Sequence, residues 1–503
     1  MKHFYPTSGL AYILLLGRGL LSYLRKYASK ALLLLFLLWV PTQLNSQVGI
    51  VDLIDKTEAA TFTITAFDKG ALIDTARAFF ISADGLAITS ASVLRDCDTT
   101  LISDHKNKKL SLSKVIAVNR STNLAMIQVA GFSRENDSYL NPSRANFETP
   151  SEFLAFMYNT DKKGRTNVFT VNKVLYPLHI GRAALTSLKV AKSSRGAPII
   201  NSSGNMVGIL HILDESGESV MLPVSLINDD DWRTVNTNWA KFKELPDRDR
   251  ICSSELADAL LLQSMGKWLE SARYFNAEIK TNRDNAQLYA MRCISRYQYG
   301  NRTAAEEDFN KALELNNNEG LVYYGRALFH LRNGNNNLAV NDLMTCLEME
   351  EDFAPGVVML GKAQILNNDI KEAFADFTYA IKLDSLFADA WYERGRMSLI
   401  YSSNQGSALL DLQKASVLDP YLEGVFTLIG DIKFNRHDYL DAILDYDRAL
   451  RYNPNDDMAL MNRGLAYYNT GLKENACTDW EKAGALGNTQ AFKLISRYCN
   501  KIK

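Results

Sequence analysis

A period of 34 residues runs through the second half of the chain and restricts its fold more than any other feature. Each copy has an alanine, an aspartate three positions later, a large residue next, and a small residue after three more positions. Successive copies are separated by 34, 34, 35, 34 and 34 residues. The copies begin at Ala305, Ala339, Ala373, Ala408, Ala442 and Ala476. Because one unit this short cannot bury its apolar face alone, the copies have to stack into an array.

A small residue precedes every copy, and the apolar spacing is helical from Ser253 to the end of the chain. These small residues are Cys293, Ala327, Gly361, Gly395, Gly430 and Gly464. Two antiparallel helices per unit, with small residues letting the backbones approach, account for this spacing. The pattern resembles the tetratricopeptide repeat over residues 254–488, with a weaker seventh copy at its start that places Ser271, Phe275 and Glu278 in register. Residues 489–503 are expected to form a capping helix.

An arginine occupies one shared position in the first helix of four repeats. The arginines are Arg292, Arg326, Arg394 and Arg463, whereas Leu360 and Ile429 stand at that position in two repeats. We expect each arginine to pair with the aspartate of its own repeat and to fix the packing of the two helices. The alternative is that these charged residues bind a ligand.

The resemblance to tetratricopeptide repeats implies a protein or peptide partner on the concave face of the array. The residues that the repeat register places in this groove are Tyr297, Tyr324, Tyr392, Arg396, Phe434, Met461 and Tyr468. An aromatic lining suits contact with a peptide. Half of these side chains could instead pack between the helices.

The first half of the chain has a different character. Residues 48–230 contain short segments rich in β-branched and apolar residues, bounded by turn signals such as Ala83-Asp84-Gly85. This pattern predicts an all-β barrel or sandwich. Residues 231–253 are charged, carry Pro246 and have little apolar rhythm, so we interpret them as a linker.

Three segments of the β half have to be considered together. They are FFISADGLAITSASVL (79–94), VIAVNRSTNLAMI (115–127) and SSRGAPIIN (193–201) followed by GNMVGI (204–209). Their order and spacing resemble trypsin-like serine proteases of the bacterial HtrA type. The stretch Val220–Val224 is similar to the closing strand of that family. The resemblance implies a double β-barrel over residues 48–230, so the expected fold is multidomain: an all-β trypsin-like double barrel followed by an all-α solenoid.

The residues that carry catalysis in that family are replaced in this chain. Ser92 stands where the family has its histidine base, Asn123 where it has the aspartate that orients the base, and Arg195 where it has the nucleophilic serine. Ser193 replaces a glycine whose backbone N–H helps to bind the oxyanion. Nucleophilic catalysis needs a hydroxyl beside a base, and arginine is a permanent cation. We therefore predict a non-catalytic domain, with Arg195 as a plug of the degenerate site or as an anchor for an anion.

The competing hypothesis is an exported serine endopeptidase with an unorthodox active site. Ser194 lies one residue before the nucleophile position, and the histidines of this half after the N-terminal segment are His105, His179 and His211. Each is more typical of a structural or surface residue than of a base. A non-catalytic β domain could hold extended peptides by strand addition, or it could serve only as a spacer.

The N-terminal segment, residues 1–47, favours export. Basic residues and no acidic ones precede the apolar run ALLLLFLLWV (31–40), and Pro41 and a polar stretch follow it. This order is typical of a signal peptide, and the run is short for a membrane span. An uncleaved anchor is the alternative, and it is the one case in which we expect contact with a membrane. The expected location is the periplasm, the cell envelope or the medium.

Net charge and cysteine spacing exclude other functions. With 56 basic and 57 acidic residues, the net charge is −1, which gives no general attraction to nucleic acid. The six cysteines form no CxxC pair, so we predict neither a metal site nor a cofactor. Cys477 and Cys499 belong to neighbouring helices at the end of the array. We expect them to pack together and to form a disulfide or remain two buried thiols.

Overall fold

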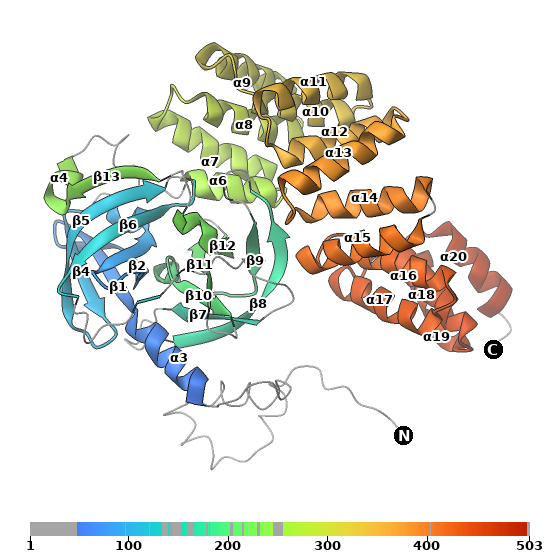
Figure 1. Ribbon diagram of the computed structural model, residues 1–503, viewed down its shortest axis with the longest axis horizontal. Coiled ribbons are helices and arrows are strands. Elements are labelled where there is room, and N and C mark those ends of the chain that lie inside the picture. The colour runs from blue at the N-terminus through green and yellow to red at the C-terminus, as the bar shows by residue number, and fades with distance from the viewer. Residues whose placement is uncertain are drawn as a thin grey trace.

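The computed structural model contains two β-barrels and a helical array that curves around the second barrel (Figure 1). A short helix, α3 (Val48–Ala59), precedes the first barrel. The structure describes residues 48–95, 97–119, 121–132, 139–140, 142, 152–157, 165–177, 180, 182–201, 205–213, 216–228, 232–244, 255–402 and 404–499. The expected signal or anchor segment, 1–47, lies outside these residues. Among the helices described, none is both long and apolar enough to cross a membrane.

The first barrel consists of six antiparallel strands in the order β5-β4-β1-β2-β3-β6, closed by pairing of β5 with β6. The strands are β1 (Thr61–Asp68), β2 (Ala71–Phe80), β3 (Leu86–Ser90), β4 (Thr99–Asp104), β5 (Lys109–Asn119) and β6 (Leu124–Ala130). Lys69 and Gly70 both have positive φ between β1 and β2, as a two-residue hairpin turn requires. Gly85, in the predicted turn before β3, has a φ of +87°, and a Cβ there would lie 2.6 Å from the carbonyl oxygen of Val129.

The second barrel is closed in the order β10-β11-β12-β9-β8-β7. Its strands are β7 (Glu152–Met157), β8 (Arg165–Leu175), β9 (Ala183–Thr186), β10 (Pro198–Asn201), β11 (Met206–Ile212) and β12 (Ser219–Pro223). Both β11 and β12 are buried along their whole length, because one face lines the barrel and the other is covered. The two closed barrels confirm the double-barrel architecture that the sequence predicted.

The segment 231–253 differs from the linker expected there. Arg233–Asn238 form β13, which pairs with β5, and Trp239–Glu244 form α4. Phe242 is fully buried in the core of the first barrel, and Trp239 packs against that core. This strand was not predicted from the sequence, because β13 lies at a sheet edge and exposes mostly polar side chains. The chain thus returns to the first barrel before the helices begin.

In the described residues from 255 to 499, seven antiparallel helix pairs and a terminal helix form the array, which confirms the predicted solenoid. The pairs are α6 (Glu255–Ser264) and α7 (Trp268–Thr281), α8 (Ala286–Gln298) and α9 (Arg302–Leu315), α10 (Leu321–Arg332) and α11 (Asn336–Met349), α12 (Ala354–Leu366) and α13 (Ile370–Leu383), α14 (Ala388–Tyr401) and α15 (Gln405–Leu418), α16 (Val425–Asn435) and α17 (Tyr439–Tyr452), and α18 (Asp457–Asn469) and α19 (Lys473–Ala485). Ser271, Phe275 and Glu278 of the weak first copy are buried on α7.

The small and large residues of a repeat meet face to face. A Cβ on Gly430 would lie 2.6 Å from the ring of Tyr446, and one on Gly464 would lie 2.4 Å from the ring of Trp480. The glycine therefore makes room for the aromatic side chain of the second helix. This contact explains why the two kinds of residue recur together at the 34-residue period.

The predicted arginine–aspartate pairs are present in all four repeats that have the arginine. Each guanidinium donates two hydrogen bonds to one carboxylate, at N–O distances of 2.5–2.9 Å. The pairs are Arg292–Asp308, Arg326–Asp342, Arg394–Asp411 and Arg463–Asp479. Both partners lie on the two helices of one repeat, which supports the packing role over ligand binding.

Helix α20 (Thr489–Leu494) and a π-helical turn (Ile495–Cys499) close the array. Cys499 forms a disulfide with Cys477 of α19, with the Cα atoms 5.7 Å apart. The expected contact between these cysteines is confirmed, in its disulfide form. The bond ties the terminal helix to the last full repeat, against which that helix packs.

Candidate functional site

Ser92, Asn123 and Arg195 stand at the three positions where the resemblance to trypsin-like proteases implies a triad. They lie where the two barrels meet. The first barrel supplies Ser92, on a 3-10 turn after β3, and Asn123, just before β6. Arg195 follows a 3-10 turn at residues 192–194 and precedes β10. Gly196 packs on the first barrel, since a Cβ there would lie 2.4 Å from the carbonyl oxygen of Arg77 and 2.9 Å from the Ser90 nitrogen.

Ser92 and Asn123 bind each other through neutral hydrogen bonds. The Ser92 N–H donates to Asn123 Oδ1 at 2.9 Å, and Asn123 Nδ2 lies 3.2 Å from Ser90 Oγ and 3.4 Å from Ser92 Oγ. Asn123 has a φ of 55°, a left-handed conformation that asparagine tolerates. The geometry keeps two segments together, and it contains neither an imidazole nor a carboxylate.

Arg195 makes an ion pair inside the β domain. Its Nη2 lies 2.7 and 2.8 Å from the two carboxylate oxygens of Asp74 on β2. The Arg195 carbonyl oxygen accepts the N–H of Arg77, also on β2, at 2.9 Å. Its side chain is 9% exposed. Of the two roles expected for Arg195, these contacts support the plug, because an internal carboxylate already takes the place of an external anion.

The turn before Arg195 directs its backbone inward. The Arg195 N–H donates to the carbonyl oxygen of Lys192 at 3.1 Å, and the Ser194 N–H donates to Ala191 at 2.9 Å. Stabilisation of an oxyanion requires backbone donors that point at the substrate. The N–H of Arg195 is instead used within the turn.

The alternative active site of the competing hypothesis is not assembled in the residues described. Ser194 is buried, and its hydroxyl has no hydrogen-bond partner there. His211 lies on β11, and its Nε2 is 2.6 Å from Oδ1 of Asp258 on α6, with both side chains buried. His105 lies in the turn between β4 and β5. His179 lies outside the described residues.

The buried pair of His211 and Asp258 is one part of a wide contact between the second barrel and the helices. A single hydrophobic cluster joins Leu175 and Leu222 of the barrel to Leu260 of α6. At its edge, Lys267 forms an ion pair with Glu218. Since one core is shared, the barrel and the first repeats form one packed unit.

A second contact links the same barrel to the middle of the array. The hydroxyl of Tyr176, just after β8, donates to the carbonyl oxygen of Leu386 at 3.1 Å, and its ring meets Phe387 edge-on at 5.1 Å. Arg182 donates to the carbonyl oxygen of Leu418, and the Tyr421 hydroxyl donates to that of Val171. These residues join β8 and β9 to the loops before α14 and α16.

Two of the residues assigned to the groove are buried. Tyr297 is 1% exposed and packs on Phe329, and Met461 is 8% exposed beneath Trp480, whose indole N–H donates to its carbonyl oxygen. Burial raises the pKa of the Tyr297 hydroxyl far above its usual value. The assignment of these two residues to an open groove is therefore wrong, because their side chains fill space between helices.

The other five groove residues are partly exposed. Tyr324 packs edge-on against Phe353 at 5.0 Å, Phe434 against Tyr439 at 5.2 Å, and Tyr468 lies 4.6 Å from Tyr498. The remaining two, Tyr392 and Arg396, lie on α14. All five lie on the first helices of repeats, on α10, α14, α16 and α18, and they are spread along the array rather than gathered in one pocket.

A cluster of charges on α12 and α14 was not predicted. Glu393 accepts from Lys362 at 3.1 Å and from Arg396 at 2.7 Å, so a nearly buried carboxylate joins two cations. Asp389 lies one turn earlier on α14, and burial raises the pKa of its carboxyl group despite the nearby Lys362. Only Arg396 belonged to the predicted set, because the other members become neighbours through packing and not through the repeat register.

Comparison with known families supports the repeat assignment. Models of the tetratricopeptide repeat match residues 427–490 and residues 321–353. The longer range spans most of α16 and all of α17 to α19, and the shorter range spans α10 and α11.

Solved structures resemble the chain in fold at low sequence identity. The APC/C hetero-tetramer Cut9–Hcn1 matches at 17% identity and a TM-score of 0.42, over 48% of this chain and 48% of that one. The serine endoprotease from Yersinia pestis matches at 14% and 0.30, over 37% and 65%. An HtrA-type protease solved with a tripeptide matches at 14% and 0.31, over 35% and 60%. The chain thus spans less than two thirds of the length of each.

Proposed function

We propose that this chain, which joins a trypsin-like double barrel to tetratricopeptide repeats, is an exported, non-catalytic binding protein. The repeats are a protein-binding scaffold, and the barrels contribute a rigid body to which the scaffold is fixed. One observation carries the non-catalytic part of the proposal: the arginine at the nucleophile position is held by Asp74. A permanent cation bound to a carboxylate cannot attack a peptide carbonyl.

The surroundings of Arg195 support the same conclusion. Ser92 and Asn123 offer no group that takes a proton near neutral pH, and the N–H of Arg195 is bound to Lys192. An acyl-transfer mechanism would need a base, a nucleophile and oxyanion donors together. All three functions would have to come from elsewhere in the chain.

Labelling with a fluorophosphonate probe tests this proposal. The full chain is incubated with the probe and, separately, with labelled casein, with active trypsin as the positive control. We expect neither a covalent adduct nor cleavage. A Ser194→Ala variant is the matched control: an adduct that disappears in this variant would establish the competing endopeptidase with an unorthodox site.

Export is proposed from the N-terminal sequence alone. The basic flank, the apolar run at 31–40 and the polar exit before residue 48 are the features of a cleaved signal. Mass spectrometry of the protein from its native cells should find a new N-terminus near Ser46. An intact N-terminus in the membrane fraction would instead establish the anchored form, and a cytosolic protein with an intact N-terminus would overturn export.

Binding by the repeats is best tested with point substitutions. Deleting the barrels would expose the cluster shared by Leu222 and Leu260, so the truncated array would not be a fair control. Phe434→Ala and Arg396→Ala change partly exposed side chains of α16 and α14 that we assign to the concave face. If the concave face binds the partner, either substitution lowers recovery of the partner in a crosslinking pull-down relative to the unmodified chain.

A further inference from the structure

Helix α17 exposes one row of side chains along its whole length. Five of its residues and the N-cap residue before it are exposed, and each lies three or four positions from another member of the row. Such spacing places side chains on one face of a helix. The row, which we call the α17 stripe, consists of Asp438, Leu440, Asp441, Leu444, Arg448 and Arg451. It is acidic at its start, apolar in its middle and basic at its end.

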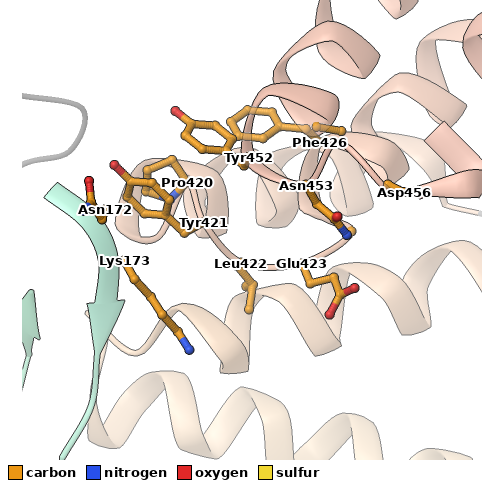
Figure 2. Close-up of a pocket in the computed structure, with 12 residues that line it drawn as sticks. Asn172, Lys173, Pro420, Tyr421, Leu422, Glu423, Phe426, Tyr452, Asn453 and Asp456 are labelled. Carbon is orange, nitrogen blue, oxygen red and sulfur yellow. The ribbon is translucent and has the colours of Figure 1, made fainter. Parts of the chain in front are cut away.

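The other faces of α17 pack inside the molecule. Tyr446 is buried against Gly430 of α16. At the end of the helix, Tyr452 meets the rings of Tyr421 and Phe426 at 4.8 and 5.8 Å and lines a cavity of about 310 Å³ beside β8 (Figure 2). No residue of the α17 stripe lines this cavity. The stripe is therefore the part of α17 that is left for a contact outside the chain.

The leucines of the stripe are not explained by the repeat. Leu444 lies two residues after the repeat alanine and is 57% exposed, and Leu440, one turn earlier, is 69% exposed. Of the other copies, α15 alone has a leucine at the position of Leu444, namely Leu410, which is also 69% exposed. The remaining four copies have Glu307, Asn341, Ala375 and Thr478 there. Exposed apolar side chains gathered in this way mark surfaces that bind another protein.

The charged ends of the stripe are open to a partner. Among the residues described, Asp438, Asp441 and Arg451 take part in no ion pair. Arg448 contacts Asp445 at 3.1 Å, but its side chain is 55% exposed, so its guanidinium has further donors to offer. Acidic residues at the start of a helix and basic residues at its end also stabilise the helix dipole. The dipole gives no reason for the leucines between them.

We propose that the α17 stripe binds the α17 stripe of a second copy of this chain, with the two helices antiparallel. When Leu444 meets Leu444 of the second copy, Asp441 faces Arg448 of the second copy, and Asp438 faces Arg451 of the second copy. The heights match, because a helix rises about 1.5 Å per residue and Asp441 and Arg448 therefore lie about 4.5 and 6 Å to either side of Leu444. A twofold axis repeats every contact, so each ion pair forms twice around an apolar centre.

Charge and size favour a second copy over other partners. The stripe has two acidic and two basic residues, so it does not attract an anionic membrane or a strongly charged protein. Helices α15 and α17 have 14 residues each, and two strips about 21 Å long and 10 Å wide give roughly 400 Å² per copy. This area is at the small end of specific interfaces, so we expect a dimer that dissociates at low micromolar concentrations.

Sedimentation velocity of the full chain at concentrations from about 1 to 200 µM tests the proposal. The weight-average sedimentation coefficient should rise from that of a monomer to that of a dimer. Leu444→Glu brings two carboxylates together at the apolar centre and should weaken dimerisation at least about a hundredfold. Leu72→Glu makes the same change at an exposed position of β2 in the first barrel and should leave the dimer unchanged.

Charge reversal tests the antiparallel register. Asp441→Lys and Arg448→Glu each place like charges opposite one another, so either variant alone should dimerise at least about tenfold more weakly. In an equimolar mixture of the two variants, the new lysine faces the new glutamate and Arg448 faces Asp441, so the dimer should return. Circular dichroism of each variant confirms that it is folded.

Three results would overturn the inference. They are a chain that stays monomeric over the whole concentration range, a dimer that Leu444→Glu leaves intact, and a mixture of the two charge-reversed variants that does not recover. The residues assigned to the concave face lie on first helices, whereas α17 is a second helix. Each of these results therefore leaves the proposed binding function standing.

Discussion

Two neighbouring repeats, α10–α11 and α12–α13, share one layout and differ in what surrounds the aspartate at the shared position, Asp342 in the first and Asp376 in the second. In the first, Arg326 holds Asp342 with two hydrogen bonds. In the second, Leu360 replaces the arginine, and burial raises the pKa of Asp376 to about 6, with Gln364 as its hydrogen-bonding neighbour. The fold therefore accepts the aspartate without its ion pair, at a cost to its ionised form.

A second difference separates these repeats. Ala327 and Leu343 meet in α10–α11, whereas Gly361 and Phe377 meet in α12–α13, where a Cβ would lie 2.8 Å from the ring. In these two repeats the smaller of the two small residues, Gly361, accompanies the larger of the two large residues, Phe377. Between these two repeats, the loss of a methyl group at the small residue is matched by a larger ring at its partner.

The largest loss of stability should come from removing the arginine of α10–α11, which makes this repeat like α12–α13. Arg326→Leu leaves the nearly buried Asp342 carboxylate without its main partner, and removing one member of such a pair costs about 3 kcal/mol. Urea denaturation should give this loss in the free energy of unfolding, and hydrogen exchange should place it in α10 and α11. The double variant Arg326→Leu/Asp342→Asn should regain most of it. A single variant as stable as the unmodified chain would contradict the packing role of the pair.

A smaller loss is expected where α20 packs on the last full repeat. Reduction of the Cys477–Cys499 disulfide opens a loop with a sequence separation of 22 residues. This should cost about 2 kcal/mol and free α20 to exchange its amide protons faster. Thiol counting on the denatured, unreduced protein provides the control, and six free thiols would show that the bond does not form.

Adding one methyl group to Gly361 tests whether this residue and Phe377 share one volume. In Gly361→Ala the new Cβ meets the Phe377 ring, and overpacking of this kind should cost about 1.5 kcal/mol after the gain in helix propensity. Adding Phe377→Leu recreates the Ala327–Leu343 arrangement of the preceding repeat and should restore the midpoint of urea unfolding. If the double variant is less stable than the single one, the two residues do not share a volume.

The regularities that allowed prediction are those that recur. The aspartate and the small residue appear at fixed spacing in six repeats, so their pairing with arginine and with the large residue could be inferred from the sequence alone. Turn signals such as Gly85, where geometry admits few residues, predicted an all-β half, and the resemblance of three segments to HtrA-type proteases implied two barrels. Fold class and the ion pairs therefore follow from local rules and repetition.

The contacts that occur once could not be predicted in this way. Tyr176, Arg182 and Tyr421 join segments more than 200 positions apart, and nothing in their local sequence marks them. The repeat register placed Tyr297 and Met461 toward the groove, but it does not show how deeply a side chain is buried between the helices. Both side chains are buried. The packing of the second barrel against the middle of the array depends on such single contacts, so it became visible only in the structure.

The smallest expected effect is a gain in stability from Asp376→Asn. This variant tests the repeat that lacks the arginine. The pKa of Asp376 is about 6 in the folded chain and near 3.8 when unfolded, so folding favours the protonated form. The contribution of protonated Asp376 to the free energy of unfolding is greatest below pH 4 and is lost as the pH rises from about 4 to 6. Because the side chain is partly exposed, solvent screening limits the cost at pH 7.5 to about 1 kcal/mol. Urea unfolding should show the variant more stable by this amount at pH 7.5 and by less at pH 4.5, while Asp342→Asn, at the paired site, should destabilise at pH 7.5. Equal differences at both pH values would show that Asp376 is ionised in the folded chain and that the missing arginine leaves no cost.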